Sequence, residues 1–392
     1  MNRRTINMFQ KFLLRRWHMF FWMITATSVF FWVILLAIRR HETQVVLNNG
    51  LYGRKLRDEG HQPGNPHLKK PLMKMENSEL HKTIMNASKL LTNQRFENLP
   101  MDKIGLIYKD ILNWSHIVSD DELDPLLNRH HFAYHLTTST CRDGSPDILI
   151  FVHSGCDHFA KRQLVRKTWG SVKTVRGLSF RTVFMLGETS NQTLQKVLET
   201  ESLLRGDIVQ GNFADTYKNL TYKHIMSLGW ILKECPGIKL IVKLDDDTML
   251  NTYNLVDYFH LPGAKDRLLY CSVYYRQGPL RHNRTKWYVS PSEYPFQKFP
   301  NYCEGFGYVM SPDVARSLYK ASEDARYFWV DDVYVTGILT LKVGLTLSDF
   351  ISGFSYKRDA TSNMNIKRAM FMSGVRNWES MWNDIFPNVT SV

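Results

Sequence analysis

The chain has 392 residues, of which 44% are hydrophobic, and a formal net charge of +13. This length exceeds one small module and predicts one large domain with accessory segments. The positive charge indicates an acidic partner (nucleic acid, an anionic membrane face or a phosphate-bearing substrate) or else a solvated basic surface. The five cysteines form no CxxC pair, which argues against a zinc site of the usual spacing and permits up to two disulfides and one free thiol.

Residues 19–38 form an apolar run without Asp, Glu, Lys or Arg. A helix of this length spans about 30 Å, enough to cross a bilayer. The alternative is a cleaved signal peptide, whose apolar region is shorter, roughly 7–15 residues, and ends at a small-residue cleavage site. Because this run is long and ends at Arg39 and Arg40, we predict an uncleaved transmembrane signal anchor.

The orientation of this anchor follows from the glycosylation acceptors. Lys and Arg residues balance on its two sides, so the positive-inside rule does not decide. All Asn-x-Ser/Thr patterns follow the anchor, and they lie at Asn86, Asn113, Asn191, Asn219, Asn283 and Asn388. This favours a cytoplasmic tail over residues 1–18 and a lumenal C-terminal part, the topology of a single-pass type II membrane protein.

Residues 39–130 are predicted to be a lumenal stem, with a loop at Gly60–Pro66 and short helices near Ile84–Leu91 and Met101–Leu112. From residue 131 to residue 392 the pattern is that of a folded domain. Strands are predicted at 147–153, 179–186, 207–210 and 238–244, and helices at 158–169, 191–204 and 215–234. This alternation predicts a mostly parallel sheet flanked by helices, with ligands beyond the carboxyl ends of its strands.

Three carboxylates, Asp245, Asp246 and Asp247, follow the last of these strands directly. Adjacent carboxylates repel one another unless a charge neutralises them, and Mg²⁺ or Mn²⁺ does so while bridging to a phosphate. On an extended backbone Asp245 and Asp247 would point the same way. The alternative is an acidic cluster at a helix start, but the position after an apolar strand favours a metal site.

A second acidic pair, Asp331 and Asp332, lies between apolar residues. This setting is typical of a general base with a tuned pKa, and the same aspartates could also cap a helix from about Val333 to Val343. A third segment, Pro300–Ser311, holds Gly305 and Gly307 between aromatic residues. Glycines there would let the backbone approach a ligand, although a tight turn between strands is the simpler interpretation.

Six segments resemble, in the same order, motifs of the β1,3-galactosyltransferase-like enzymes of glycosyltransferase family 31. They are Lys161–Gly170, Val183–Gly187, Asp215–Lys223, Lys243–Asp247, Tyr302–Ser311 and Asp331–Tyr334. The resemblance covers about residues 132–350. It implies an α/β fold of the GT-A, nucleotide-sugar-binding type, a UDP-sugar donor, Mn²⁺ or Mg²⁺, and inversion at the anomeric carbon.

The resemblance also implies roles for single residues. Asp245 and Asp247 would serve the metal, with Asp247 favoured as the direct ligand, and Asp245 and Asp246 would belong to the donor site. Asp332 would be the general base, with Asp331 beside it. Residues that would contact or shape the donor site are Arg162, Arg166 and Lys223.

This sequence departs from the family pattern at three points. Asp331 stands where the family usually has Glu, and Glu304 stands where a small residue is commoner. Some relatives supply a C-terminal His to the metal, whereas no histidine follows His282 in this chain. The resemblance therefore implies no third protein ligand of that kind here.

The sequence thus predicts a metal-dependent, inverting glycosyltransferase of the Golgi membrane with a lumenal catalytic domain at 131–392. It would transfer a sugar, with galactose favoured by the resemblance, from a UDP-sugar to a glycan acceptor on a glycoprotein or glycolipid in β1,3 linkage. N-acetylglucosamine and N-acetylgalactosamine donors stay open, and so does a non-catalytic lumenal lectin or chaperone of the same fold. A nucleic-acid partner is not expected, because a lumenal domain does not meet nucleic acid.

Overall fold

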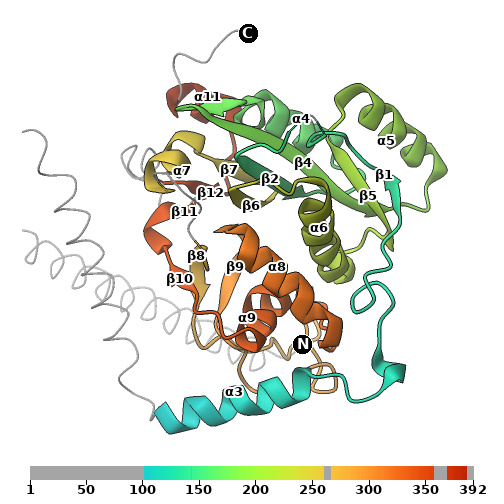
Figure 1. Cartoon of the computed structure of the whole chain (residues 1–392), viewed down its shortest axis with the longest axis vertical. Helices are drawn as coiled ribbons and strands as arrows, with labels where there is room; N and C mark the ends of the chain where they lie inside the picture. The colour runs from blue at the N-terminus through green and yellow to red at the C-terminus, as the bar shows by residue number, and fades with distance from the viewer. Residues whose placement is uncertain (1–100, 143, 260–265, 357–368, 386–392) are drawn as a thin grey trace, which may run out of the picture. The chain divides into compact units, whose positions relative to one another are not determined.

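The computed structural model describes residues 101–142, 144–259, 266–356 and 369–385, which all belong to one compact unit, Arg95–Val392 (Figure 1). The predicted tail, the anchor at 19–38, the stem up to residue 100, Asn86 and Asn388 lie outside the described residues. In the described ranges, no helix has the length and apolar character needed to cross a membrane.

The strands and helices predicted between residues 147 and 244 are present, with ends that shift by a few residues. The strands are β2 (Ile148–His153), β4 (Leu178–Glu188), β5 (Ile208–Ala214) and β6 (Leu240–Asp245). The helices are α4 (Phe159–Lys167), α5 (Gln192–Arg205) and α6 (Leu220–Glu234). Every residue of β2 is buried, as its continuous apolar run predicts for a central parallel strand.

The main sheet has the order β1-β5-β4-β2-β6-β9-β8-β10, with β3 paired to β4. The further strands are β1 (Tyr134–Leu136), β3 (Thr174–Val175), β8 (Leu269–Tyr274), β9 (Tyr302–Met310) and β10 (Ser348–Asp349). Strands β5, β4, β2 and β6 run parallel, but β9 is antiparallel to both β6 and β8. The expectation of a mostly parallel sheet is therefore right for β5, β4, β2 and β6. It is wrong at the edges, because β1 is antiparallel to β5 and the sheet beyond β6 is mixed. A second sheet has the order β11-β12-β7 and consists of β11 (Phe354–Tyr356), β12 (Phe371–Ser373) and β7 (Thr248–Leu250).

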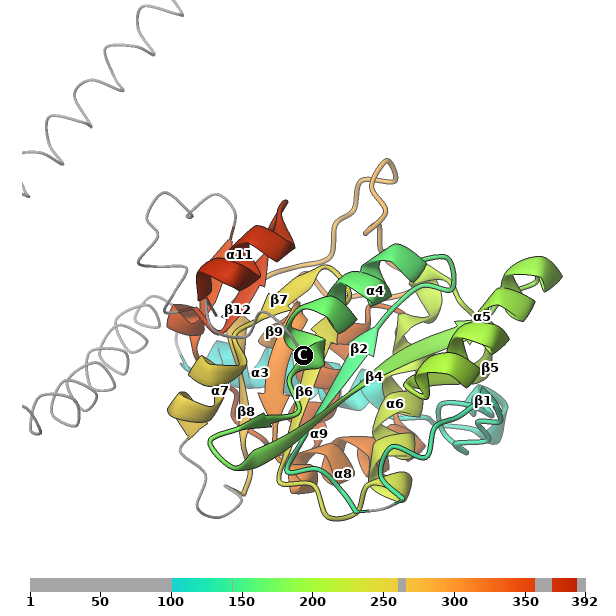
Figure 2. The ribbon, with the colours of Figure 1, turned by 90° about the horizontal axis from the view of Figure 1, so that it is seen from above.

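Helices cover both faces of the main sheet (Figure 2). The alternation of side chains along β2 explains why. Leu149 and Phe151 belong to one buried cluster, and Ile148, Ile150 and Val152 belong to another. The first cluster includes residues of α3 (Met101–Ser115), α6, α8 (Pro312–Ala321) and α9 (Leu339–Lys342). The second includes residues of α4, α5, α7 (Thr252–Phe259) and α11 (Trp378–Ile385). The result is a three-layered α/β/α domain.

The segment before β1 packs on this domain. Ile111 of α3 and Leu127 are fully buried in the first cluster. Asn128 donates hydrogen bonds from Nδ2 to the backbone oxygens of Ser322 and Ala325, at 2.6 and 2.9 Å. Residues 107–128, which the sequence assigns to the stem, therefore pack as part of the domain.

The five cysteines form two disulfides and leave one free thiol, within the range that the sequence permits. Cys141 is bonded to Cys235, Cys271 is bonded to Cys303, and Cys156 is buried with a free thiol. Disulfides of this kind persist in oxidising compartments. The Cys271–Cys303 bond joins β8 to β9, the strand that carries the glycine-containing segment.

Candidate active site

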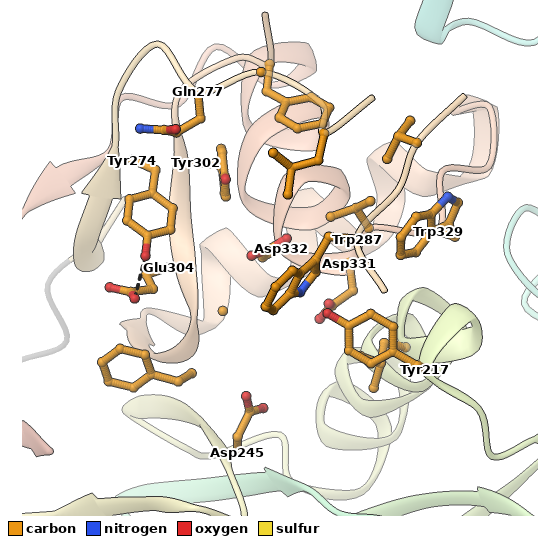
Figure 3. Close-up of a pocket in the computed structure, with 18 of the residues that line it drawn as sticks. Tyr217, Asp245, Tyr274, Gln277, Trp287, Tyr302, Glu304, Trp329, Asp331 and Asp332 are labelled. Carbon is orange, nitrogen blue, oxygen red and sulfur yellow. Dashed lines mark hydrogen bonds between the residues drawn. The ribbon is translucent and has the colours of Figure 1, made fainter. Parts of the chain in front are cut away.

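A cleft of about 440 Å³ opens at the carboxyl end of β6 (Figure 3). Because β9 runs antiparallel to β6, its first residues lie beside the last residues of β6 and form one wall. Residues 329–332 and the loop between β8 and β9 form the rest of the cleft. The residues that line the cleft and enter the argument are Tyr217, Lys243, Asp245, Tyr274, Trp287, Tyr302, Glu304, Gly305, Trp329, Asp331 and Asp332.

Three of the predicted acidic residues meet in this cleft, although up to 87 positions separate them in sequence. Asp245 projects from the end of β6, and Asp331 and Asp332 project from the opposite side (Figure 3). Asp332 also caps the following turn, because its Oδ1 accepts a hydrogen bond from the Val333 N–H at 2.8 Å. The two interpretations of this pair, a helix cap and a cleft residue, thus both hold.

The helix that follows Asp332 differs from the regular helix predicted over Val333–Val343. Residues Val333–Ile338 form a π-helical turn, and α9 continues from Leu339 to Lys342. π-Helical turns are rare and occur often at functional sites.

Lys243 supplies a positive charge beneath the carboxylates, and the sequence analysis did not select it as a site residue. It is only 2% exposed, and its Nζ donates to Asp245 Oδ1 at 2.6 Å and to the backbone oxygen of Gly305. A buried lysine is costly unless it is paired. The signal for it was present in the sequence as a lysine inside the apolar run just before the acidic triplet.

One lysine does not balance three carboxylates, and the pKa values reflect this. Burial raises the pKa of Asp332, and the neighbouring charge of Asp331 raises it further. Burial by the cleft walls also raises the pKa of Asp245 to about 6, against the opposing effect of Lys243. For Asp331, burial raises the pKa, but the hydrogen bond from His224 and the charge of Lys243 outweigh it and hold the pKa below its ordinary value. The cleft therefore holds a surplus of negative charge that a proton or a cation can neutralise.

The glycines of the third segment lie inside strand β9, so the prediction of a tight turn there is wrong. A Cβ atom on Gly305 would lie 3.1 Å from Asp332 Oδ2, and one on Gly307 would lie 2.9 Å from Phe371 Cδ1. The glycines thus allow β9 to pass close to Asp332 and to the second sheet. A strand with two glycines lacks the composition that usually reveals a strand.

The three aspartates of the triplet lie in three different environments, because β6 ends at Asp245 and a tight turn follows. Asp246 is buried, and its carboxylate accepts hydrogen bonds from Ser154 Oγ, His158 Nδ1 and Lys161 Nζ at 2.8, 2.7 and 2.9 Å. Asp246 therefore fastens the turn to α4 instead of reaching into the cleft. Asp247 is 68% exposed, so the extended backbone that would align it with Asp245 does not continue.

In the part of the chain that the structure describes, no group of three or more His, Cys, Asp or Glu side chains is arranged to hold a metal ion. The carboxylates of Asp245 and Asp247 are nevertheless hard oxygen ligands of the kind that Mg²⁺ and Mn²⁺ take. Such ions are usually bound by one or two carboxylates, with substrate phosphates and waters as the other ligands. The donor set therefore fits a metal that binds together with a diphosphate.

The three basic residues predicted for the donor site are held by protein groups. Arg162 is fully buried and pairs with Glu201 at 2.7 Å, and it also donates to the backbone oxygens of Gly155 and Cys156. Arg166 pairs with Glu201 at 2.6 Å and with Asp207 at 2.8 Å.

Lys223 is buried and donates to Asp215 Oδ1 at 2.6 Å and to the backbone oxygen of Ser154 at 2.7 Å. Together with Arg162 it fixes residues 154–156, which follow the carboxyl end of β2. The geometry supports a role in shaping this edge of the sheet and gives these side chains no direct contact with the cleft.

An aromatic wall borders the cleft, and the sequence analysis did not find it. We use the term for Tyr217, Trp287 and Trp329, which line one side (Figure 3). Tyr217 is 44% and Trp287 50% exposed, and Lys286 Nζ lies 4.9 and 4.8 Å from their ring centroids. Exposed rings at the mouth of a polar cleft present apolar faces to a ligand.

On the other side of the cleft, Tyr274 donates a hydrogen bond of 2.6 Å to Glu304 Oε1 (Figure 3). Glu304 is one of the positions where the sequence departs from the family pattern. Its carboxylate therefore belongs to the cleft wall.

Four glycosylation acceptors lie in the described residues. Asn113 and Asn283 are exposed. Asn191 is exposed too, but its side chain caps α5 by accepting from the Leu194 N–H at 3.1 Å. Asn219 is half-buried and donates from Nδ2 to the backbone oxygen of Ala214 at 2.9 Å. Asn113 and Asn283 are thus the acceptors whose side chains the structure leaves most accessible.

The mixed α/β sheet, with carboxylates at the carboxyl end of a central strand, fits a GT-A-like fold. Residues 160–350 match the family model described as Galactosyltransferase. β-1,3-Galactosyltransferase 1 of Mus musculus and that of Homo sapiens are each 32% identical over 263 residues, which cover 66% of this chain and 80% of the relative. β-1,3-Galactosyltransferase 5 of Gorilla gorilla gorilla is 35% identical over 217 residues, which cover 55% of this chain and 72% of the relative. The chain therefore belongs to glycosyltransferase family 31 and is β1,3-galactosyltransferase-like, which confirms the resemblance seen in the sequence.

Proposed function

We propose that this protein is a metal-dependent, inverting glycosyltransferase that transfers galactose from a UDP-sugar to a glycan acceptor in β1,3 linkage. The observation that carries the proposal is the meeting of Asp245, Asp331 and Asp332 in one cleft with a single buried lysine, Lys243. The relatives bear the name of this activity, which supports the choice of galactose and of the linkage.

Asp332 is the general base of the proposed reaction. Its carboxylate takes the proton of the acceptor hydroxyl while that oxygen attacks C1 of the donor sugar from the face opposite the diphosphate. The bond from C1 to the diphosphate oxygen breaks, UDP leaves, and the anomeric configuration inverts. One base suffices for this reaction, and no protein nucleophile takes part.

Mn²⁺ or Mg²⁺ would be the metal of this reaction, and Asp247 and Asp245 would hold it. When bound, it supplies positive charge to the diphosphate as the leaving group departs. Lys243 holds Asp245 by a hydrogen bond of 2.6 Å and so orients the last carboxylate of the strand. The raised pKa of Asp245 supports the assignment, because the carboxylate lacks a full counter-charge in the protein alone.

The test is a transfer assay on the full-length chain purified in detergent. It is incubated with Mn²⁺, a panel of UDP-sugars and a panel of glycan acceptors, and UDP release and product linkage are measured. We expect UDP release that depends on the acceptor and on Mn²⁺, with UDP-galactose as the best donor. A folded preparation that releases UDP from no donor would contradict the enzyme proposal.

The same donor panel decides between two alternatives. A preference for UDP-N-acetylglucosamine or UDP-N-acetylgalactosamine would keep the transferase and replace the sugar. A lumenal lectin or chaperone would bind glycan without releasing UDP. The carboxylates in the cleft favour the enzyme, because a lectin has no need of an acidic group with a raised pKa.

We place the protein in the Golgi membrane as a single-pass type II protein with a lumenal catalytic domain. Two disulfides and the accessible acceptors Asn113 and Asn283 support a lumenal environment. Treatment of the cellular protein with an N-glycosidase should increase its electrophoretic mobility, and protease added to intact membranes should leave the catalytic domain uncut.

The activity should fall as the solution becomes acidic. A base must be deprotonated to act, and burial together with the charge of Asp331 raises the pKa of Asp332 to about 8. We therefore expect kcat/KM for the acceptor to fall roughly tenfold per unit as the pH drops below this value. Initial rates at fixed, saturating donor and Mn²⁺ measure this, and a flat profile between about pH 6 and 9 would contradict Asp332 as the base.

The aromatic wall should act on the acceptor. Trp287→Ala removes an exposed ring from the cleft mouth, and we expect the acceptor KM to rise roughly tenfold while the donor KM stays within twofold. Steady-state kinetics with each substrate varied in turn make the measurement. Tyr253→Ala, which alters a 37% exposed tyrosine outside the cleft, is the control and should leave both KM values unchanged.

A further inference from the structure

A chain of buried hydrogen bonds runs beneath the cleft from Tyr308 through His224 to Asp331. His224 of α6 and Tyr308 of β9 are fully buried. His224 Nδ1 lies 3.1 Å from Asp331 Oδ2, and His224 Nε2 is hydrogen-bonded to the hydroxyl of Tyr308. The sequence analysis did not select either residue.

The geometry defines the protonation of this chain. An ionised carboxylate can only accept, so the hydrogen must lie on Nδ1 of His224. Nε2 then accepts from the Tyr308 hydroxyl. A neutral imidazole with its hydrogen on Nδ1 satisfies both contacts, and no added charge is needed.

The two carboxyls of the pair therefore have different surroundings. Asp331 receives a hydrogen bond from a buried side chain, whereas Asp332 receives one from the backbone N–H of Val333 at 2.8 Å. Two adjacent carboxylates do not ionise together at low cost, and their surroundings decide which of them ionises first.

We infer that His224 is a positioning residue that assigns the two roles within the pair: by donating Nδ1–H to Asp331 it makes Asp331 the permanent anion and leaves Asp332, which faces the cleft, as the carboxyl that exchanges a proton. This inference rests on the proposed function of Asp332 as the base. The inference adds His224 as the residue that distinguishes the two carboxyls. It also extends the site to a part of α6 that does not line the cleft.

The groups around His224 keep it neutral. His153 from β2 meets its ring edge-on, with centroids 5.1 Å apart, and Lys243 from β6 adds positive charge nearby. Burial lowers the pKa of both His224 and His153 and raises the pKa of Tyr308. On α6 itself, Lys223 is paired with Asp215. The two histidines and Tyr308 therefore stay uncharged in the range where Asp332 would titrate.

The inference is tested by the pH profile of transfer in three variants of the full-length chain. His224→Leu removes the donor from Asp331, so the proton of the singly ionised pair can pass from Asp332 to Asp331. Asp332 is then ionised at lower pH, and the acidic limb of kcat/KM should move down by about one to two pH units. His224→Asn keeps an N–H near the position of Nδ1 and should return the limb to within a few tenths of a unit of the wild type. Donor KM should change less than twofold in both.

Tyr308→Phe is the matched control. It removes the other hydrogen bond of His224 and a buried polar group of similar cost, but it leaves the donor to Asp331 in place. We expect a lower melting temperature and an unmoved limb. An unmoved limb in folded His224→Leu, or an equal shift in Tyr308→Phe, would overturn the inference.

A second measurement does not depend on activity. In wild-type protein with ¹⁵N-labelled histidine, the signal that His224→Asn removes should report a neutral ring with hydrogen on Nδ1 from about pH 6 to 9. Hydrogen on Nε2, or titration in that range, would overturn the inference even if transfer is normal. Loss of transfer in the wild type with the expected ring signal would instead point to a failure of the proposed function.

Discussion

Asp332→Asn should retain the binding of donor and metal and lose transfer. The amide has the shape of the carboxylate but cannot take a proton, so the acceptor oxygen stays a poor nucleophile. Positioned general bases contribute roughly 10²–10⁴-fold to rate, and we expect kcat to fall by that factor. The measurement is initial transfer rate at saturating substrates, with donor binding followed separately by calorimetry.

A matched control separates loss of the base from loss of a negative charge in the cleft. Glu304→Gln removes another cleft carboxylate, held by Tyr274 at 2.6 Å, that has no part in proton transfer. It should change the acceptor KM and leave kcat within a few-fold of the wild type. Near-normal transfer by Asp332→Asn would move the base elsewhere, with Asp331 as the first candidate.

Asp247→Ala should abolish metal-dependent donor binding. The alanine removes the carboxylate that we assign as the direct metal ligand, and Asp245 alone would have to hold the ion. A metal that neutralises a departing diphosphate supplies several kcal/mol, so we expect kcat/KM to fall by roughly 10²-fold or more. Titration of UDP with and without Mn²⁺ measures the effect, and the difference between the two isotherms should vanish.

Asp157→Ala is the control for this experiment. Asp157 is an exposed carboxylate just before α4, with 81% of its side chain accessible, and it does not line the cleft. Its removal changes the net charge by the same amount and should leave the Mn²⁺ effect on UDP binding intact. Retained Mn²⁺ dependence in Asp247→Ala would remove Asp247 from the metal site.

The parallel half of the fold could be predicted because its pattern is local. β2 is a continuous apolar run, β6 is an apolar run with Lys243 inside it, and each is bounded by residues that end a strand. The antiparallel half could not, because β9 holds two glycines, and their close contacts with Asp332 and Phe371 depend on distant segments. Sequence patterns reflect contacts between residues that are close in the chain. These glycines are instead required by residues that are close only in the folded structure.

The residues of the site also divide into those that the sequence predicts and those that it does not. The acidic residues could be predicted from the sequence because charged residues beside apolar runs indicate a special role. Three of them line the cleft. Trp287 and His224 are not visible, since a tryptophan in a loop and a histidine in a helix have many ordinary uses. For the arginines predicted at the donor site, the sequence does not distinguish contact from shaping: a motif that holds Arg162 against Glu201 looks the same in sequence as one that holds it against a phosphate.

The Cys271–Cys303 disulfide braces one wall of the cleft. Cys303 is followed directly by Glu304 and Gly305, whose backbone oxygen accepts from Lys243. The wall against which Asp332 lies is therefore braced by a covalent bond that forms only when two thiols are oxidised. A chain kept under reducing conditions would carry the same cleft residues and lack this covalent brace behind them.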